Sequence, residues 1–199
     1  MSTTGAIVIR SPGRPRDERA TRAITDAALR QLMEVGYGRL SMESVAEEAG
    51  VARATVYRRY RNKADLVTAA IAEYEAADPS PEPSDDPRND LLRFLADFDN
   101  RFTRSCVEVL GSLLANHEDP RSLALHRERV IALRRAYVRS LLERARDLGQ
   151  LDPEVDLDLA LEMLVGVVIA RAVGGMPSLP GWAQRALELI WSTVGADTR

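Results

Sequence analysis

Residues with reactive or metal-binding side chains are scarce in this chain of 199 residues. Its one cysteine, Cys106, cannot form a disulfide within the chain, and its two histidines show no spacing typical of a zinc site. The motifs of phosphate-binding loops, serine hydrolases and zinc proteases are also missing. We therefore expect no metal, no cofactor and no enzyme activity.

Long apolar runs are missing as well. The longest segment without a charged side chain, residues 172–184, has 13 residues and contains two prolines and three glycines, whereas a membrane span needs about 20 apolar residues. Near the N-terminus only residues 6–9 are apolar, too few for a secretory signal. The sequence thus predicts a cytoplasmic protein with no membrane partner, and its 45% hydrophobic content predicts a folded core.

The net charge of -3 is unevenly distributed along the chain. Residues 1–70 contain 12 Lys and Arg against 8 Asp and Glu, whereas residues 71–199 contain 15 against 22. The densest basic segment, residues 51–63, contains five cations and no acid. Such a segment is either a solvated helix face or a surface that binds an anion such as nucleic acid.

Apolar residues recur at helical spacing, and no segment alternates like a strand. We therefore predict an all-α fold of about nine helices, with an N-terminal three-helix helix-turn-helix domain and a larger C-terminal helical domain. The predicted helices are residues 17–35, 41–50, 52–59, 62–71, 89–104, 105–116, 121–148, 156–173 and 181–194.

Composition divides the chain into four parts. Residues 1–16 are predicted to be a flexible basic arm, and residues 17–76 the helix-turn-helix domain with a linking fourth helix. Residues 77–88 contain four prolines and four acids, which predicts a linker without helix or strand. Residues 89–199 form the second domain.

Two short helices joined by a turn at Gly50 are typical of a helix-turn-helix. The hydroxyl of Ser41 is placed to cap the first helix, and Ala52, Val56 and Tyr60 form a stripe expected to face the core. A single helix fits the DNA major groove, where its N-terminal residues meet base edges. The second helix is therefore the candidate recognition helix for double-stranded DNA.

Outward side chains of this second helix are candidate DNA contacts. Arg53 and Thr55 are placed to meet bases, and Arg53 leads because arginine on guanine is the commonest base contact. Tyr57 and Arg58 lie one turn further on and are placed for phosphate oxygens. Lys63 lies in the first turn of the next helix, whose positive end also attracts phosphate.

Residues 19–71 resemble the DNA-binding domain of the tetracycline-repressor (TetR) family of bacterial transcription regulators. The resemblance rests on Gly36-Tyr37, Ser41, Val45-Ala46, Ala49-Gly50-Val51, Thr55-Val56-Tyr57 and Lys63-Ala64-Asp65-Leu66. Three residues depart from the family pattern: Ala52 replaces a Ser or Thr cap, Ala54 a common Gly, and Tyr60 a common Phe. The methyl group of Ala54 is placed either to touch a thymine methyl or to hold the backbone slightly off the bases.

Arg14 and Arg16 belong to the proline-containing segment 10–16, which we expect to be extended rather than helical. An extended arm suits a narrow minor groove, where arginine is attracted by the negative potential of A·T tracts. The alternative is a tail whose arginines only add solubility.

The family resemblance implies that the C-terminal domain binds a small-molecule effector and forms a homodimer. The helices 156–173 and 181–194 are the expected dimer contacts, because the first is apolar on nearly every side. The alternative is a buried helix in the core of a monomer.

An effector pocket is expected among apolar residues of this domain. All three phenylalanines fall on one helical stripe, which is either ordinary core or pocket lining. The candidate pocket residues are Phe94, Phe98, Phe102, Leu110, Leu114, Tyr137 and Met163. Cys106 is interpreted as a core filler, and His117, Glu118, Asp119 and His126 as solvated residues around a turn at Pro120 rather than metal ligands.

These observations predict a dimeric transcription regulator, a repressor that a small effector releases from a two-fold operator. One alternative is a dimeric DNA-binding protein without an effector, whose second domain serves only dimerisation or protein contact. Another is an enzyme whose basic segment binds a phosphorylated substrate.

Overall fold

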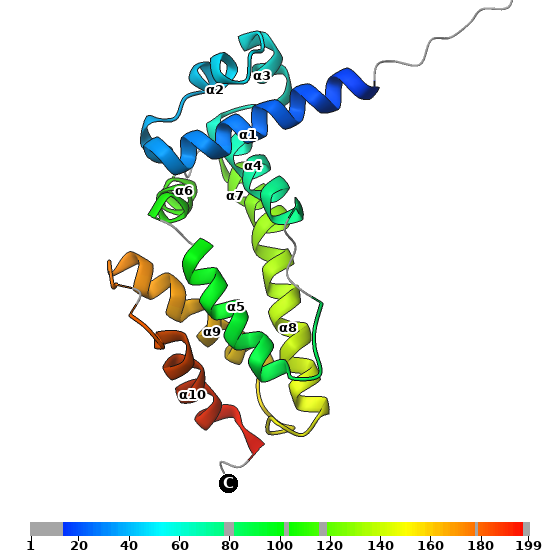
Figure 1. The fold of residues 1–199 in the computed structure, drawn as a ribbon, viewed down its shortest axis with the longest axis vertical. Coiled ribbons are helices and arrows are strands. Elements are labelled where there is room, and N and C mark those ends of the chain that lie inside the picture. Colours follow the sequence, from blue (N-terminus) through cyan, green and yellow to red (C-terminus); the bar gives the residue numbers. More distant parts are fainter. Residues whose placement is uncertain (1–13, 78–81, 102–103, 116–118, 178, 197–199) are drawn as a thin grey trace, which may run out of the picture.

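The computed structural model describes residues 14–77, 82–101, 104–115, 119–177 and 179–196. Within these ranges the chain is helical, with one isolated antiparallel bridge between Leu151 and Gly195 (Figure 1). The elements are α1 (Arg14–Arg39), α2 (Met42–Glu48), α3 (Arg53–Arg59), α4 (Lys63–Ala77), α5 (Pro87–Arg101), α6 (Arg104–Ala115), α7 (Pro120–His126), the π-helical turn η1 (Arg127–Ile131), α8 (Ala132–Asp147), α9 (Leu157–Val173) and α10 (Trp182–Val194). None of these helices combines the length and the apolar character of a membrane span.

The all-α prediction is confirmed over the described residues. Because α7, η1 and α8 follow one another without a break, they form one long rod, and the described chain then contains the nine helical rods that the sequence predicts. Most predicted boundaries lie within three residues of the observed ones. Two helices end later than predicted, α1 at Arg39 and α4 at Ala77, and two begin earlier, where proline lies in the first turn.

The start of α1 is the first such difference. The sequence predicts that residues 14–16 are extended, but α1 begins at Arg14 and has Pro15 in its first turn. Proline is tolerated there because the first backbone N–H groups of a helix have no partner within the helix. Pro87 likewise begins α5 inside the predicted linker. The rest of the predicted arm, residues 1–13, lies outside the described residues.

The far end of α1 bends at Gly36, whose φ of 81° and ψ of 166° are not helical. A left-handed φ favours glycine because it has no Cβ. A Cβ at Gly36 would also lie 3.0 Å from Oε2 of Glu108, and this carboxylate accepts a hydrogen bond from the backbone N–H of Tyr37 at 3.2 Å. The bend therefore joins α1 to α6 of the C-terminal half.

Two apolar cores are present, and their boundary does not follow the predicted linker. The first core lies among α1 to α4 and includes the fully buried Ile24, Val45, Val56 and Leu66. It also takes in Val109 and Leu113 from α6 and Val130 from η1. The helix-turn-helix domain is thus packed on part of the C-terminal half of the chain.

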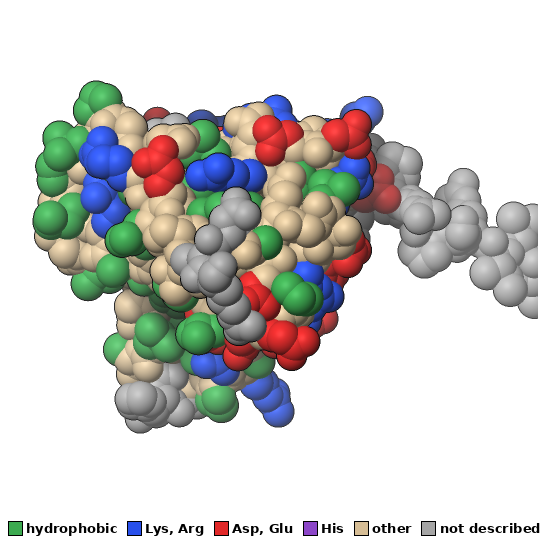
Figure 2. Space-filling model, turned by 90° about the horizontal axis from the view of Figure 1, so that it is seen from below, with side chains coloured by type: hydrophobic (Ala, Val, Ile, Leu, Met, Phe, Trp, Pro, Cys, Tyr) green, Lys and Arg blue, Asp and Glu red, His purple; other side chains and the backbone are tan. Residues whose placement is uncertain are grey.

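The second core lies among α5, α8, α9 and α10 and contains Leu95, Leu141, Leu164 and Leu187. It does not use every apolar side chain of α9 and α10: Leu159 is 55% exposed, and Leu189 is 72% exposed. Seen from the end where the C-terminus lies, hydrophobic side chains gather on the left, the side of α9 and α10 in Figure 1 (Figure 2).

Candidate nucleic-acid interface and ligand cavity

The helix-turn-helix is built by local hydrogen bonds. The hydroxyl of Ser41 accepts from the backbone N–H of Ser44 at 3.0 Å, and the hydroxyl of Ser44 accepts from the N–H of Ser41 at 3.2 Å, which makes a reciprocal cap at the start of α2. The turn passes through Gly50 at a φ of 66°, and α3 begins at Arg53. Ala52 precedes α3 without a side-chain cap and is exposed, so the prediction that it faces the core is wrong.

The orientation of α3 is set by its one fully buried residue. Val56 has no exposed surface, and Tyr60, just after the helix, is buried beside it. The opposite face carries Arg53, Ala54, Tyr57 and Arg58, all exposed, with Thr55 half-buried at its edge. The side chains predicted to contact DNA therefore lie on one accessible face.

Tyr57 has a partner that sequence reasoning missed. Its hydroxyl donates a short hydrogen bond to Oε1 of Glu43 on α2. That bond lowers the pKa of Glu43 and raises the pKa of Tyr57. With its proton engaged, the phenol presents only lone pairs outward, so Tyr57 must leave Glu43 before it can donate to a phosphate oxygen.

The five cations of residues 51–63 divide into two groups. Arg53 and Arg58 are exposed, and neither donates a hydrogen bond to any residue that the structure describes. Arg59 donates to the carbonyl of Thr55 at 3.1 Å, and Arg61 pairs with Asp65 at 2.6 Å. The basic segment therefore presents fewer free charges than its composition suggests.

Lys63 belongs to the engaged group. Its Nζ donates to the carbonyl of Tyr37 at 2.8 Å and lies 4.3 Å from the centre of the Tyr37 ring. Burial lowers the pKa of Lys63. Its contact with phosphate stays a prediction, as do the roles of Arg14 and Arg16, whose side chains lie outside the described part of the structure.

A polar joint connects the start of α4 to the start of α7. The buried hydroxyl of Ser122 lies 2.8 Å from Oδ1 of Asp65 and 2.6 Å from Oδ2 of Asp119. The amide of Asn62 also donates to Asp119, at 2.7 Å. Since α4 follows α3 after three residues, this joint ties the candidate recognition helix to the C-terminal half.

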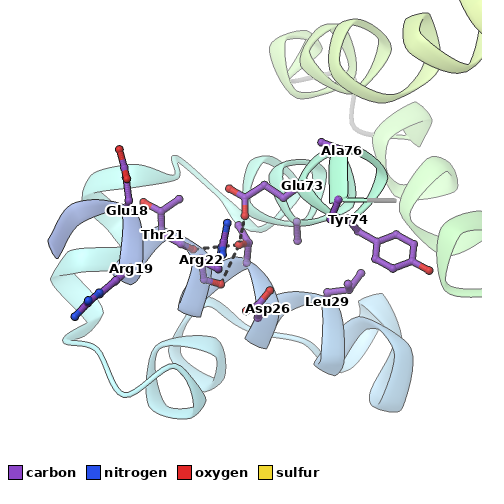
Figure 3. A pocket seen from close by; sticks show the side chains of 12 residues that line it. Glu18, Arg19, Thr21, Arg22, Asp26, Leu29, Glu73, Tyr74 and Ala76 are labelled. Carbon is purple, nitrogen blue, oxygen red and sulfur yellow. Dashed lines mark hydrogen bonds between the residues drawn. The ribbon is translucent and has the colours of Figure 1, made fainter. Parts of the chain in front are cut away.

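An open cleft of about 980 Å³ lies between the N-terminal part of α1 and the C-terminal part of α4 (Figure 3). Its rim carries charges of both signs, including Arg22, Asp26 and Glu73. Thr25 donates across it to Glu73 at 2.5 Å, and this bond couples α1 to α4. Its width and mixed charge make it a groove between two helices rather than an enclosed ligand site.

A smaller, more enclosed cavity of about 90 Å³ lies where the two halves of the chain meet. Its apolar walls come from α4, α5, α6, η1 and α9, and its polar groups come from α6, α7 and α8. The lining residues are Ile71, Phe98, Cys106, Leu110, His126, Val130, Ile131, Arg134, Arg135, Val165 and Ile169.

Some of the predicted pocket residues line this cavity and others do not. Phe98 and Leu110 line it. Phe94 packs instead on Tyr137, with ring centres 5.9 Å apart, as part of the second core. Leu114 is 51% exposed and Met163 is 37% exposed, and Phe102 lies outside the described residues.

His126 lies at the end of α7 and is only 7% exposed, so its interpretation as a solvated loop residue is wrong. It is buried because α7 and η1 turn this side of the rod toward α4. Its Nδ1 lies 3.2 Å from the buried hydroxyl of Thr68. Burial lowers its pKa from 6.5 to about 4, with the charge of Arg134 acting in the same direction, and the ring is therefore neutral at pH 7.

Together, an exposed recognition helix and a helical body with an internal cavity define a DNA-binding regulator of the helix-turn-helix class. Comparison with known proteins agrees. A family described as "Bacterial regulatory proteins, tetR family" matches residues 24–70, and one described as "Tetracyclin repressor-like, C-terminal domain" matches residues 81–190. The chain belongs to the tetR family of bacterial regulatory proteins and is a DNA-binding transcriptional regulator.

Individual relatives support this assignment. The uncharacterized HTH-type transcriptional regulator Rv1556 of Mycobacterium tuberculosis (strain H37Rv) is 31% identical over 170 residues, which cover 85% of this chain and 81% of the relative. The solved TetR family regulator SCO0332 is 26% identical, covers 88% of this chain and 96% of its own, and has a TM-score of 0.69. FadR from Bacillus subtilis, solved in complex with stearoyl-CoA, is 19% identical to this chain. The match covers 87% of this chain and 98% of FadR, and its TM-score of 0.63 shows that the two share the fold.

Proposed function

We propose that this regulator is a repressor whose dimer binds a two-fold operator and is released when a small effector enters the cavity between the two halves of the chain. The observation that carries this proposal is that α4 belongs to both sites. It begins directly after α3, and its residues Thr68 and Ile71 lie at the cavity, the first through His126 and the second as part of the wall.

Operator binding would follow from the exposed face of α3. In this proposal Arg53 reads a base, with Ala54 and Thr55 beside it, while Tyr57, Arg58 and Lys63 contact phosphates. Ser41 fixes the start of α2, which crosses the phosphate backbone. Arg14 and Arg16 at the start of α1 add positive charge that attracts the DNA phosphates.

Dimerisation would follow from the uncovered apolar side chains of α9 and α10. Leu159 and Met163 lie one turn apart on α9 and are both exposed, although neighbouring residues of the same helix are fully buried. Exposed leucine and methionine at this spacing are typical of a helix face that packs on a second helix. Such a dimer would set the distance between its two α3 helices.

Release requires that the effector bind the two conformations with different affinity. The cavity lies at the contact of α4 with η1, and the joint at Ser122 and Asp65 couples α4 to α7, the helix that continues directly into η1. A ligand that separates α4 from η1 would tilt α4, and α1 would follow because Thr25 is bonded to Glu73. The two recognition helices would then no longer match the operator.

The proposed DNA contacts are tested by selecting bound fragments from random duplex DNA and then comparing variants on the selected operator. Arg53→Ala should cost about 1 to 3 kcal/mol and relax base preference at one position in each half-site. Lys63→Ala should weaken all sequences alike and lower the salt dependence. Arg127→Ala, an exposed arginine of η1, is the matched control. Loss of base preference in Lys63→Ala with none in Arg53→Ala would contradict these roles.

A further inference from the structure

The cavity at α4 and η1 has a chemistry that narrows the class of its ligand. Its walls are mainly aliphatic and aromatic, and its polar lining groups are the thiol of Cys106 on α6 and nitrogen-bearing side chains on α7 and α8. The three nitrogen-bearing side chains are His126, Arg134 and Arg135. No carboxylate is among the described residues that line the cavity.

His126 lines this space, and its contact with Thr68 indicates which ring nitrogen carries the proton. The hydroxyl of Thr68 is fully buried, and Nδ1 of His126 is its hydrogen-bond partner among the described residues. If the hydroxyl donates, both groups are satisfied and the ring proton lies on Nε2; the reverse arrangement leaves a buried hydroxyl proton without an acceptor, which costs free energy. Nε2–H is therefore free to donate to a ligand.

The two arginines differ in how closely each is already paired with a carboxylate of the protein. Arg134 forms a two-point ion pair with Glu75 on α4, and its guanidinium lies 4.9 Å from the centre of the Phe98 ring. Arg135 has one ion-pair partner in the described part of the chain, Glu162 on α9, at 3.9 Å. That distance is too long for a hydrogen bond. The guanidinium of Arg135 thus retains its fork of donors for another carboxylate.

The size of the cavity limits the apolar part of the ligand. Its volume is about 90 Å³, which is smaller than the roughly 150 Å³ of an apolar cavity that accommodates benzene. A short aliphatic group fills such a space, whereas a long acyl chain does not fit without separating the helices.

We propose that the cavity binds a compact, short-chain apolar carboxylic acid, whose carboxylate pairs with Arg135 and accepts a hydrogen bond from Nε2 of His126. This inference rests on the proposed effector role of the cavity, and it names the class of effector. Arg135 supplies specificity for the anion, because a guanidinium matches a carboxylate with two parallel hydrogen bonds. A neutral amide of the same shape cannot form the charge-assisted pair with Arg135.

The test uses the full chain and isothermal titration with butanoate, hexanoate, decanoate and hexanamide. Hexanoate should bind about tenfold or more tightly than hexanamide, because a charge-assisted pair is lost in the amide. Among the three acids, the affinity should be highest for butanoate and lowest for decanoate, because the cavity is small. Equal binding of acid and amide, tightest binding of decanoate, or no binding of any acid would overturn the proposal.

Substitutions of Arg135 test whether this residue binds the carboxylate of the ligand. Arg135→Gln should lower the affinity for hexanoate to that for hexanamide, Arg135→Lys should keep part of the preference, and Arg127→Gln, an exposed arginine of η1, should bind like the unchanged protein. If Arg135→Gln does not fold, Arg135→Lys is the deciding variant. It should lower the affinity for hexanoate and leave the affinity for hexanamide unchanged. An acid preference that survives in both Arg135 variants would refute the assignment.

Fluorescence anisotropy with labelled operator separates this inference from the proposed function. If the acids bind as described but do not release DNA, the ligand class is correct and the effector role fails. If a neutral apolar compound releases DNA while no acid binds, the effector role is correct and the ligand class is wrong.

Discussion

The buried imidazole of His126 makes the stability of this protein depend on pH in a definite direction. The pKa of His126 is lowered from 6.5 to about 4, first by burial and then by the charge of Arg134. The unfolded chain therefore binds a proton at a higher pH than the folded chain does. Stability from this residue is complete above pH 6.5 and decreases as the pH falls toward 4.

The size of the effect follows from proton linkage. With folded and unfolded pKa values of about 4 and 6.5, lowering the pH from 7.5 to 5 should remove about 2 kcal/mol of unfolding free energy, and the full difference is about 3 kcal/mol. A loss of this size is large for a domain whose net stability is about 5 to 15 kcal/mol.

The assay is urea unfolding at pH 7.5, 6.5, 5.5 and 5.0 for the unchanged protein and for His126→Gln, at one fixed protein concentration because dimerisation makes stability depend on it. The difference between the two proteins removes the contribution of the carboxylates, which titrate in both. Over this range the free energy of unfolding of His126→Gln should fall by about 2 kcal/mol less than that of the unchanged protein. Parallel pH profiles would refute the reasoning.

The pKa itself is accessible by NMR. The chain has two histidines, so His117→Gln leaves a single imidazole signal to titrate. That signal should not change between pH 7.5 and 5.5. A midpoint near 6.5 would show that the imidazole is hydrated in the folded protein, and the packing of α7 and η1 on α4 would then differ from the one described above.

Two further changes test the local and the quaternary arguments. Ser41→Ala removes the acceptor for the N–H of Ser44 and should lower the unfolding free energy by about 1 kcal/mol. Ser140→Ala on the exposed side of α8 is a control that should have little effect, and equal losses would contradict the capping argument. Leu159→Glu places a charge on the 55% exposed leucine of α9 and should give a monomer in sedimentation with weakened operator binding, whereas Leu133→Glu on α8, also exposed, should stay dimeric. A dimeric Leu159→Glu would exclude α9 from the interface.

The helix-turn-helix could be predicted because its determinants are close in the sequence. Ser41 and Ser44 cap α2, Gly50 permits the turn, and Val56 gives α3 its buried side, all within a few residues of one another. The errors in this region are also local. Proline begins α1 and α5 at positions where a helix tolerates it, and reading every proline as a break placed these starts two to three residues late.

The cavity could not be predicted in the same way. Its lining comes from α4, α5, α6, α7, η1, α8 and α9, and no spacing in the sequence shows that Ile71, His126 and Val165 meet. The π-helical turn contributes to the same difficulty. It shifts the face of the rod between α7 and α8, so a strict helical period misplaces the residues that follow it.

The amino-acid sequence by itself determined the helices, the helix-turn-helix and the exposed face of α3, because hydrogen bonds and apolar spacing over one or two turns are sufficient for them. Tertiary structure alone decided which charges remain free. It engaged Lys63 with Tyr37, tied Tyr57 to Glu43, buried His126 against Thr68 and left Arg135 at the cavity. These outcomes depend on contacts between residues distant in the chain, and the accessibility and charge state of a side chain follow from such contacts.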